Sequence, residues 1–329
     1  MQERWQQDLL PYLPRELRAP LSALNPRLAA GVEELRLRVN RPLMVAAGGK
    51  DVFLDAAGHS VSAKSAIEVT RLHADEVFER VTRASVYAVE HELQSGYTTL
   101  PGGYRVGFCG KTVLRDGQVA VVAPCAAFNI RIVREVRGCA EPLLPFLLDG
   151  SGVHSTLIVS PPGLGKTTLL RDIVRVLSAG QNGTGFHVSV VDERSEIAAC
   201  YGGVPQTELG PRTDVLDSCP KAVGMRMLLR SMAPNVLVVD ELARADEFEA
   251  ARDAAGAGVA VIASAHGACI EQVMERPAFE GSVLNPVFTR CVLLGRDRCP
   301  GRVLGVYELP GGKWLGAPAE PGGGSCVCG

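Results

Sequence analysis

The residues of this 329-residue chain that point most directly to chemistry are a lysine and a threonine behind a glycine-rich turn. Residues 156–170 read TLIVSPPGLGKTTLL: an apolar run, a Pro/Gly turn and then a helical pattern. Backbone amides of such a turn, placed just before a helix, can bind phosphate oxygens. We therefore predict a nucleotide site in which Lys166 reaches the β- and γ-phosphates and the Thr167 hydroxyl holds Mg²⁺.

The predicted phosphate-binding loop departs from the usual pattern at its first glycine, which is Ser160 here. We expect Pro161, Pro162 and Gly163 to make the turn, and the intact Lys-Thr pair to preserve nucleotide binding. The residues predicted to bind ATP are Pro162, Gly163, Leu164, Gly165, Lys166, Thr167 and Thr168.

Two pairs of adjacent carboxylates follow apolar runs downstream of this loop. Asp192 and Glu193 come after the first run, and Asp240 and Glu241 come after the second. In open α/β sheets, ligands bind beyond the carboxyl ends of the strands. We predict that Asp240 binds Mg²⁺ and that Glu241 orients and deprotonates the attacking water. Glu193 is predicted to be catalytic as well.

A further apolar run, residues 259–265, ends in His266. An isolated histidine is more often structural, but one at a strand end beside active-site strands can hydrogen-bond the γ-phosphate. We expect His266 to act there as a sensor. In sequence, another strand lies between the strand before the phosphate-binding loop and the strand before Asp240, and Glu241 follows Asp240 directly. We therefore also expect a strand to lie between these two strands in the sheet, as in RecA-like ATPases.

The order of the apolar segments predicts an α/β protein with two domains. Residues 1–140 combine short helices, alternating strands and a glycine-rich hairpin, which indicates a smaller α+β domain. Residues 141–312 alternate strands and helices, which predicts a mainly parallel sheet. Together with the phosphate-binding loop and the expected separating strand, this indicates a RecA-like P-loop ATPase domain. Within it, residues 202–217 are expected to form a long, turn-rich loop. The Gly/Pro-rich residues 313–329 are expected to be a disordered tail.

The bulk properties of the chain exclude several classes of protein. Lys and Arg number 34 and Asp and Glu 36, so net charge gives no general case for binding nucleic acid or an anionic membrane. The first residues lack the core of a signal peptide, and no apolar run approaches the length of a transmembrane helix. The ten cysteines show no paired CxxC spacing of a zinc site. We expect a cytoplasmic protein with reduced thiols.

Six arginines in the first half of the chain leave three interpretations open: Arg36, Arg38, Arg105, Arg131, Arg134 and Arg137. They can form the solvated face of a domain, approach the γ-phosphate bound by a neighbouring subunit, or bind nucleic acid. For the nucleotide role we favour Arg131 and Arg134, which lie near the predicted domain junction.

The order of these motifs resembles that of the type II and type IV secretion ATPase superfamily. Its Walker A, Asp-box, Walker B and His-box elements have counterparts at residues 160–168, 191–197, 230–241 and 264–267. Nearly the whole chain resembles one family within it, that of stage III sporulation protein AA. The residues that carry this resemblance are 34–38, 85–87, 96–107, 129–131, 160–168, 191–197 and 210–217. The glycine-rich hairpin at 96–107 and the segment PRTDVLD at 211–217 are more specific than the Walker motifs.

The resemblance implies an ATP-hydrolysing motor that uses ATP and Mg²⁺ and works as a hexameric ring in the cytoplasm of the mother cell. Its implied partners are membrane proteins that form a channel to the forespore. Two alternatives remain: a nucleic-acid-binding ATPase, and a nucleotide-gated scaffold with little turnover. The near-neutral charge argues against the first, and the intact Glu241 argues against the second.

Overall fold

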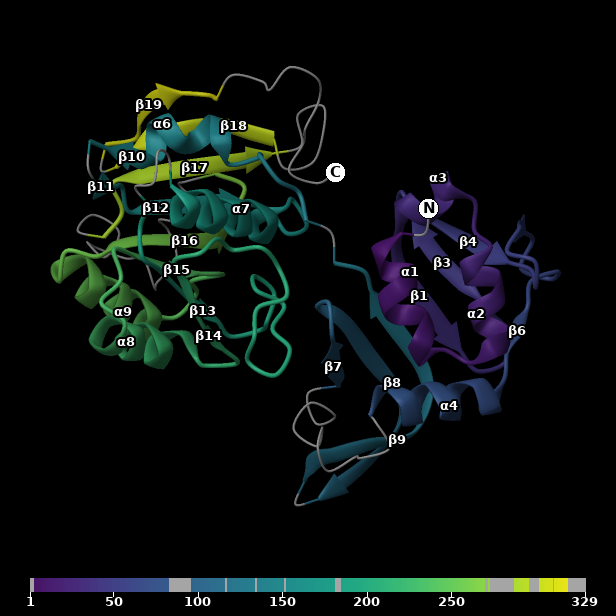
Figure 1. The fold of residues 1–329 in the computed structure, drawn as a ribbon. Helices are drawn as coiled ribbons and strands as arrows, with labels where there is room; N and C mark the ends of the chain where they lie inside the picture. Colours follow the sequence, from purple (N-terminus) through teal and green to yellow (C-terminus); the bar gives the residue numbers. More distant parts are fainter. Residues whose placement is uncertain are drawn as a thin grey trace. The chain divides into compact units, whose positions relative to one another are not determined.

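The structure, a computed structural model, describes residues 3–82, 96–115, 117–133, 135–150, 152–180, 185–269, 272, 287–295, 302–309 and 311–318. The chain divides into two compact units, Met1–Arg134 and Glu135–Gly329 (Figure 1). The sequence places this boundary between residues 140 and 141. It lies earlier because Cys139 and Ala140 pack in the core of the second unit, where the Ala140 N–H donates to Asp172 Oδ2 at 2.8 Å.

The first unit begins with short helices and continues as an antiparallel sheet. Its described elements are α1 (Arg4–Leu9), η1 (Leu10–Tyr12), α2 (Arg15–Ser22), α3 (Pro26–Gly31), β1 (Val32–Arg38), β2 (Arg41–Pro42), β3 (Met44–Ala47), β4 (Lys50–Leu54), β5 (Ser60–Val61), β6 (Glu68–Val69), α4 (Arg71–Val81), β7 (Tyr97–Leu100), β8 (Tyr104–Arg115) and β9 (Gln118–Arg131). Seven described strands pair antiparallel in the order β5-β4-β3-β1-β9-β8-β7, and β2 pairs with β6. The predicted hairpin is β7 with β8.

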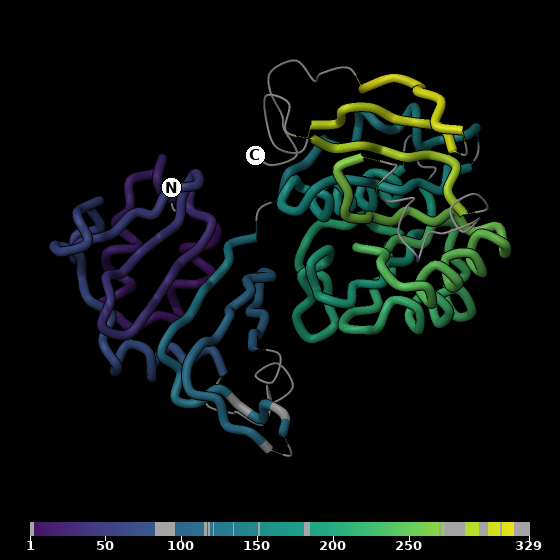
Figure 2. Tube along the Cα trace, turned by 180° about the vertical axis from the view of Figure 1, so that it is seen from behind, coloured from purple at the N-terminus to yellow at the C-terminus, as the bar shows by residue number. Residues whose placement is uncertain are grey.

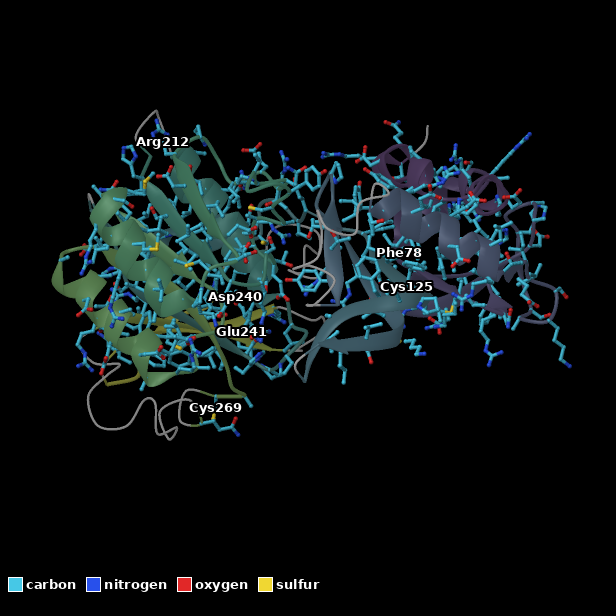
Figure 3. All side chains as sticks on the ribbon, turned by 90° about the horizontal axis from the view of Figure 1, so that it is seen from below. Phe78, Cys125, Arg212, Asp240, Glu241 and Cys269 are labelled. Carbon is cyan, nitrogen blue, oxygen red and sulfur yellow. The ribbon has the colours of Figure 1, made fainter. Side chains whose placement is uncertain are left out.

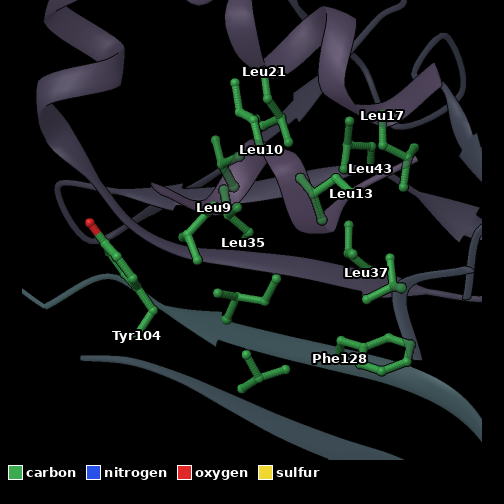
Figure 4. Packing of buried hydrophobic residues seen from close by; sticks show 14 of the residues in the cluster. Leu9, Leu10, Leu13, Leu17, Leu21, Leu35, Leu37, Leu43, Tyr104 and Phe128 are labelled. Carbon is green, nitrogen blue, oxygen red and sulfur yellow. The ribbon is translucent and has the colours of Figure 1, made fainter. Parts of the chain in front are cut away.

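Leucines from the helices and the sheet form one core in this unit. Leu9, Leu13 and Leu17 point from α1, the following residues and α2 onto Leu35 and Leu37 of β1 (Figure 4). All five are almost fully buried. Because alternate residues of β1 point inward, the charged residues between them stay on the other side of the strand. This alternation is the pattern that the sequence shows over residues 33–39.

The second unit is built on one large sheet. Its described elements are η3 (Glu141–Leu143), α6 (Leu144–Leu147), β10 (Leu148–Asp149), β11 (Gly152–Val153), β12 (Thr156–Ser160), α7 (Lys166–Ala179), β13 (Val188–Asp192), β14 (Thr213–Asp217), α8 (Lys221–Ser231), β15 (Val236–Val239), α9 (Ala245–Gly256), β16 (Ala260–His266), β17 (Arg290–Gly295), β18 (Arg302–Glu308) and β19 (Lys313–Gly316). The described strands run in the order β14-β13-β15-β16-β12-β17-β18-β19. Pairing is parallel from β14 to β17 and antiparallel for the last two strands.

Helices cover both faces of this sheet, so the unit has three layers (Figure 1). Helix α7 and the segment around α6 pack in one cluster with residues such as Ile158 and Val238. Helices α8 and α9 pack on the opposite face with Leu157 and Val239. Adjacent residues of the central strands therefore belong to different clusters. Burial on both faces explains why β12, β13 and β15 are uninterrupted apolar runs.

The order of the strands confirms that one strand separates the loop strand from the Asp240 strand. The separating strand is β16, which ends in His266, whereas β13 lies on the far side of β15. The parallel order β13-β15-β16-β12 brings the four strand ends that carry predicted site residues to one edge of the sheet. Because all four strands point the same way, their carboxyl ends face a common space.

Two segments predicted as irregular contain strands. Residues 213–217 of the predicted loop form β14, which pairs with β13 in register from Val188↔Thr213 to Asp192↔Asp217. Residues 313–316 of the predicted tail form β19, where Trp314 pairs with Tyr307 of β18. The last strands lie side by side at one edge of the sheet (yellow in Figure 2). Unpaired backbone groups at a sheet edge favour the addition of such a strand, despite its glycine-rich neighbours. Residues 319–329 lie outside the described residues.

The helices within the described ranges are short. None of them combines the length and the apolarity that crossing a bilayer requires.

Candidate active site

The phosphate-binding loop joins β12 to α7 through two glycines in the left-handed region. Gly163 has φ +72° and Gly165 has φ +76°. A Cβ atom is disfavoured at such φ values, which explains why glycines stand at both positions. Gly165 is the N-cap of α7 and offers no side-chain acceptor for the amides of the first turn. These amides, at the positive end of the helix dipole, are therefore available to an anion.

Lys166, the first residue of α7, is turned inward and is only 5% exposed. Its Nζ lies 3.3 Å from the Ser160 carbonyl oxygen, 3.2 Å from that of Pro161 and 3.0 Å from His266 Nδ1. Burial lowers the pKa of this ammonium, an effect that Asp240 and Glu241 oppose. Ser160 contributes to the arrangement, since its hydroxyl donates to the Pro161 carbonyl at 2.8 Å and lies 3.4 Å from Nζ.

Asp240 follows β15 and is held by two hydroxyl groups. Thr167 Oγ1 donates to Asp240 Oδ2 at 2.7 Å, and Ser264 Oγ, from β16, donates to Asp240 Oδ1. A hydroxyl in the first turn of the helix that follows a phosphate loop, beside a carboxylate, is a donor set that suits Mg²⁺. Among the described residues, no group of three or more His, Cys, Asp or Glu can hold a metal ion. The Thr167 hydroxyl and the Asp240 carboxylate could each supply an oxygen to a Mg²⁺ ion, which commonly keeps water and phosphate oxygens as its other ligands.

Glu241 lies next to Asp240 (Figure 3) and has an unusual backbone, with φ +51°. Its N–H donates to Ser264 Oγ at 2.9 Å. Its carboxylate is contacted from two sides: His266 Nε2 lies 2.8 Å from Oε1, and Arg194 Nη1 lies 3.4 Å from Oε2. A non-glycine residue at this φ costs about 1–2 kcal/mol, and such strain persists only where the surroundings hold it.

His266 connects the loop lysine to this glutamate. The Lys166 ammonium has only protons to give, so His266 Nδ1 must accept from it. That acceptance leaves Nε2 as the ring nitrogen that donates to Glu241. The result is a continuous hydrogen-bonded chain from Lys166 through His266 to Glu241, built from α7 and from the ends of β16 and β15. Three of the predicted site residues are thus brought into contact.

Asp192 and Glu193, at the end of β13, have different partners. Asp192 is 2% exposed and accepts from the N–H groups of Glu196, Ile197 and Ala198 at 2.8, 3.0 and 2.8 Å. Burial raises its pKa to about 6, against the effect of these bonds. Glu193 instead contacts Lys221, whose Nζ lies 3.1 Å from Oε2.

Of the two predicted arginines, the structure describes one. Arg131 ends β9 in the first unit, where its Nε lies 3.3 Å from Glu34 Oε1, and 62% of its side chain is exposed. Arg134 lies outside the described residues. Three contacts were not foreseen from the sequence: those of Ser264, Arg194 and Lys221. Only Lys221 carried a local signal, a lysine as the first residue of a helix, where the dipole favours carboxylates.

Comparison with known proteins identifies the family of this chain. The profile of the family described as "Sporulation stage III, protein AA" matches residues 3–314. The chain belongs to this family. It is 41% identical to "Stage III sporulation protein AA" of Bacillus subtilis (strain 168) over 305 residues, which are 92% of this chain and 95% of that protein.

Solved structures show the same fold at low sequence identity. The ATPase DotB of Legionella pneumophila covers 80% of this chain, with a TM-score of 0.54, 16% identity and 72% of its own chain matched. The pilus retraction motor PilT, solved with bound ADP, also covers 80%, with a TM-score of 0.53, 15% identity and 74% of its own chain matched. The chain therefore shares the fold of DotB and PilT, and the predicted α/β fold with a RecA-like second unit is confirmed.

Proposed function

We propose that this chain binds ATP with Mg²⁺ and hydrolyses it at the carboxyl ends of β12, β15 and β16. The observation that supports this most strongly is the chain of contacts from Lys166 through His266 to Glu241, beside the Thr167–Asp240 pair. An ordinary connection between a strand and a helix needs neither a buried lysine nor a glutamate with a strained backbone. Burying the Lys166 ammonium and straining the Glu241 backbone both cost free energy. Both are explained if the loop binds phosphate and the glutamate faces a water molecule.

In this proposal each residue has a separate task. The amides of residues 162–168 and the Lys166 ammonium bind the phosphates, while Thr167 and Asp240 hold the metal ion, which supplies charge neutralisation when bound. Glu241 orients the attacking water and accepts its proton. His266 contacts the γ-phosphate, since it lies between Lys166 and Glu241 and is placed to report whether that group is present.

Three further predicted residues keep their roles as proposals. Arg131 and Arg134 are proposed to approach the nucleotide of a neighbouring subunit. The Arg131 side chain is largely exposed, so its pair with the half-buried Glu34 is weak and would exchange readily for a phosphate. Glu193 is proposed to act on the site through Lys221, because its carboxylate contacts that ammonium.

The cellular role that we propose follows from the family and the fold together. The relatives include a sporulation protein, and the fold is shared with a pilus retraction motor. We infer a hexameric motor in the cytoplasm of the mother cell, which energises a membrane-embedded channel to the forespore. Its partners would be membrane proteins of that channel. ATP turnover is the part of this proposal that the site itself supports.

Substitution of Lys166 tests the nucleotide proposal. The wild-type chain should bind ATP and release phosphate with Mg²⁺, and Lys166→Ala should weaken binding about 10- to 100-fold, the range for hydrogen bonds to charged groups. Equilibrium binding of a fluorescent ATP analogue measures the loss. Lys313→Ala removes an exposed lysine of β19 and should bind as the wild type does. Equal binding by Lys166→Ala would contradict the proposed site.

A further inference from the structure

Lys221 is a buried cation between the ends of β13 and β15. It is the first residue of α8, and 11% of its side chain is exposed. Its Nζ lies 3.1 Å from Glu193 Oε2, 3.0 Å from the Glu241 carbonyl oxygen and 3.5 Å from Glu247 Oε1. The three contacts come from the end of β13, the end of β15 and the first turn of α9. One ammonium thus joins three separate elements beside the proposed site.

The position of this lysine is unfavourable by local rules. A positive charge at the first residue of a helix opposes the helix dipole. Taking an ammonium out of water costs several kcal/mol unless partners replace the water. Pro220, the N-cap of α8, has no side-chain acceptor that could reduce this cost. The three oxygen atoms that contact Nζ replace the lost water. The free energy of burying the Lys221 ammonium therefore depends on the positions of residues 193, 241 and 247.

Glu247 extends the effect of Lys221 to the turn after Glu241. It is 2% exposed, and its Oε2 accepts from the N–H groups of Ala243 and Arg244 at 2.8 and 3.1 Å. The other oxygen of the same carboxylate faces Lys221. The Lys221 ammonium therefore holds the Glu241 carbonyl directly. It holds the N–H groups of Ala243 and Arg244 indirectly, through the Glu247 carboxylate.

We propose that Lys221 is a positioning residue for Glu241. This inference rests on the proposed ATP hydrolysis. Glu241 has φ +51°, so its backbone must be held on both sides to keep its carboxylate at His266. Ser264 Oγ holds its N–H and Lys221 Nζ holds its C=O. Without Lys221 the residue is free to relax to an ordinary φ, which moves its carboxylate away from the water that it orients.

The proposal predicts a loss of turnover with nucleotide binding retained. Lys221→Met keeps the apolar stem of the side chain and removes the ammonium. We expect its kcat for ATP to fall about 100-fold, the loss typical of a displacement of about 1 Å at a reacting group. Affinity for a non-hydrolysable ATP analogue should change less than about threefold, because the loop and α7 are untouched. A merely structural role would lower the melting temperature without this separation of kcat from affinity.

A matched control lies on the same helix. Arg226→Met removes a cation of α8 whose pairing with Asp253 is exposed, and it should leave both kcat and affinity unchanged. If Lys221→Met shows no cooperative melting transition, Lys221→Arg replaces it and keeps the charge that the buried Glu247 carboxylate needs. Its planar guanidinium cannot place a donor at the same point, so kcat should again fall at least about tenfold.

The outcomes separate this inference from the function on which it rests. Wild-type protein that binds ATP without turnover would contradict the proposed hydrolysis and remove the basis of the inference. If the wild type hydrolyses ATP and folded Lys221→Met has an unchanged kcat, the proposed role of Lys221 is overturned while the proposed hydrolysis stands. Lys221→Arg serves for this comparison if Lys221→Met is unfolded. Wild-type turnover with reduced kcat and retained analogue binding supports both.

Discussion

The same four residues, Val-Val-Asp-Glu, end two neighbouring strands of the second unit and are used differently. They occupy residues 190–193 on β13 and 238–241 on β15. On β13 the aspartate is closed in by three backbone amides. On β15 the aspartate is held by hydroxyl groups, one of them from the helix that follows the phosphate loop. Identical sequence therefore stabilises a loop in one place and lines the proposed site in the other.

The difference arises from what surrounds each strand end. β15 lies beside β16, which supplies Ser264 and His266, and β16 lies beside the loop strand β12. β13 lies one position farther from that loop, and the chain after it turns back so that its own amides reach Asp192. Position in the sheet, rather than the local motif, decides which carboxylate lies at the proposed nucleotide site. Each of the following experiments changes one side of this comparison.

A large effect on turnover is expected at Asp240. Asp240→Asn keeps the shape of the side chain and removes the charge that faces the metal ion. ATP turnover should fall about 100-fold, the upper range for residues that hold or orient a metal. The free energy of unfolding should stay within about 0.5 kcal/mol, because Asp240 is not closed in by backbone amides. Phosphate release and chemical denaturation measure the two quantities. A loss of stability without a loss of turnover would contradict the proposed role of Asp240 in the site.

Asp192 should behave in the opposite way. Asp192→Ala leaves three amides without their acceptor, so the free energy of unfolding should fall by about 2–4 kcal/mol. Urea denaturation of the variant gives this value. Asp253→Ala, which removes an exposed carboxylate of α9, is the control and should change stability by less than about 0.5 kcal/mol. A stability equal to that of the wild type would show that Asp192 does not hold the loop.

A smaller effect should follow from the raised pKa of Asp192. Burial raises it from 3.8 to about 6. Ionisation then costs the folded state more than the unfolded state; the penalty is absent below about pH 3.8 and complete above about pH 6. The stability of the wild type relative to Asp192→Asn should therefore decrease as pH rises through 6, by at most about 3 kcal/mol. Denaturation of both proteins between pH 4 and 7 measures this. A constant difference would contradict the raised pKa.

Much of the site was predictable because its residues end apolar strands. The runs before Asp240 and His266 are long enough to be recognised, and the geometry of parallel sheets brings their ends together. The sequence also predicted that one strand separates β12 from β15, but not which strand it is. That β16 takes this place depends on packing among residues far apart in the chain, and it brings Ser264 to Asp240.

The strand β14 and the contacts of Lys221 were not predicted from the sequence, for related reasons. The strand β14 lies in a segment rich in turn residues, and it forms because β13 offers an open edge with which it can pair. The contacts of Lys221 depend on where β13, β15 and α9 meet. A lysine at the start of a helix is a weak local anomaly, and only the folded chain shows the three oxygens that it serves.

The most direct test of the account is ATP turnover by Glu241→Gln beside Glu193→Gln. The two variants make the same change at equivalent positions of the two motifs. Glu241→Gln should bind ATP with near wild-type affinity and hydrolyse it at least about 100-fold more slowly, since a general base contributes about 10²- to 10⁴-fold. Glu193→Gln should lose less turnover, because its carboxylate acts through Lys221. Undiminished hydrolysis by purified Glu241→Gln would contradict the account.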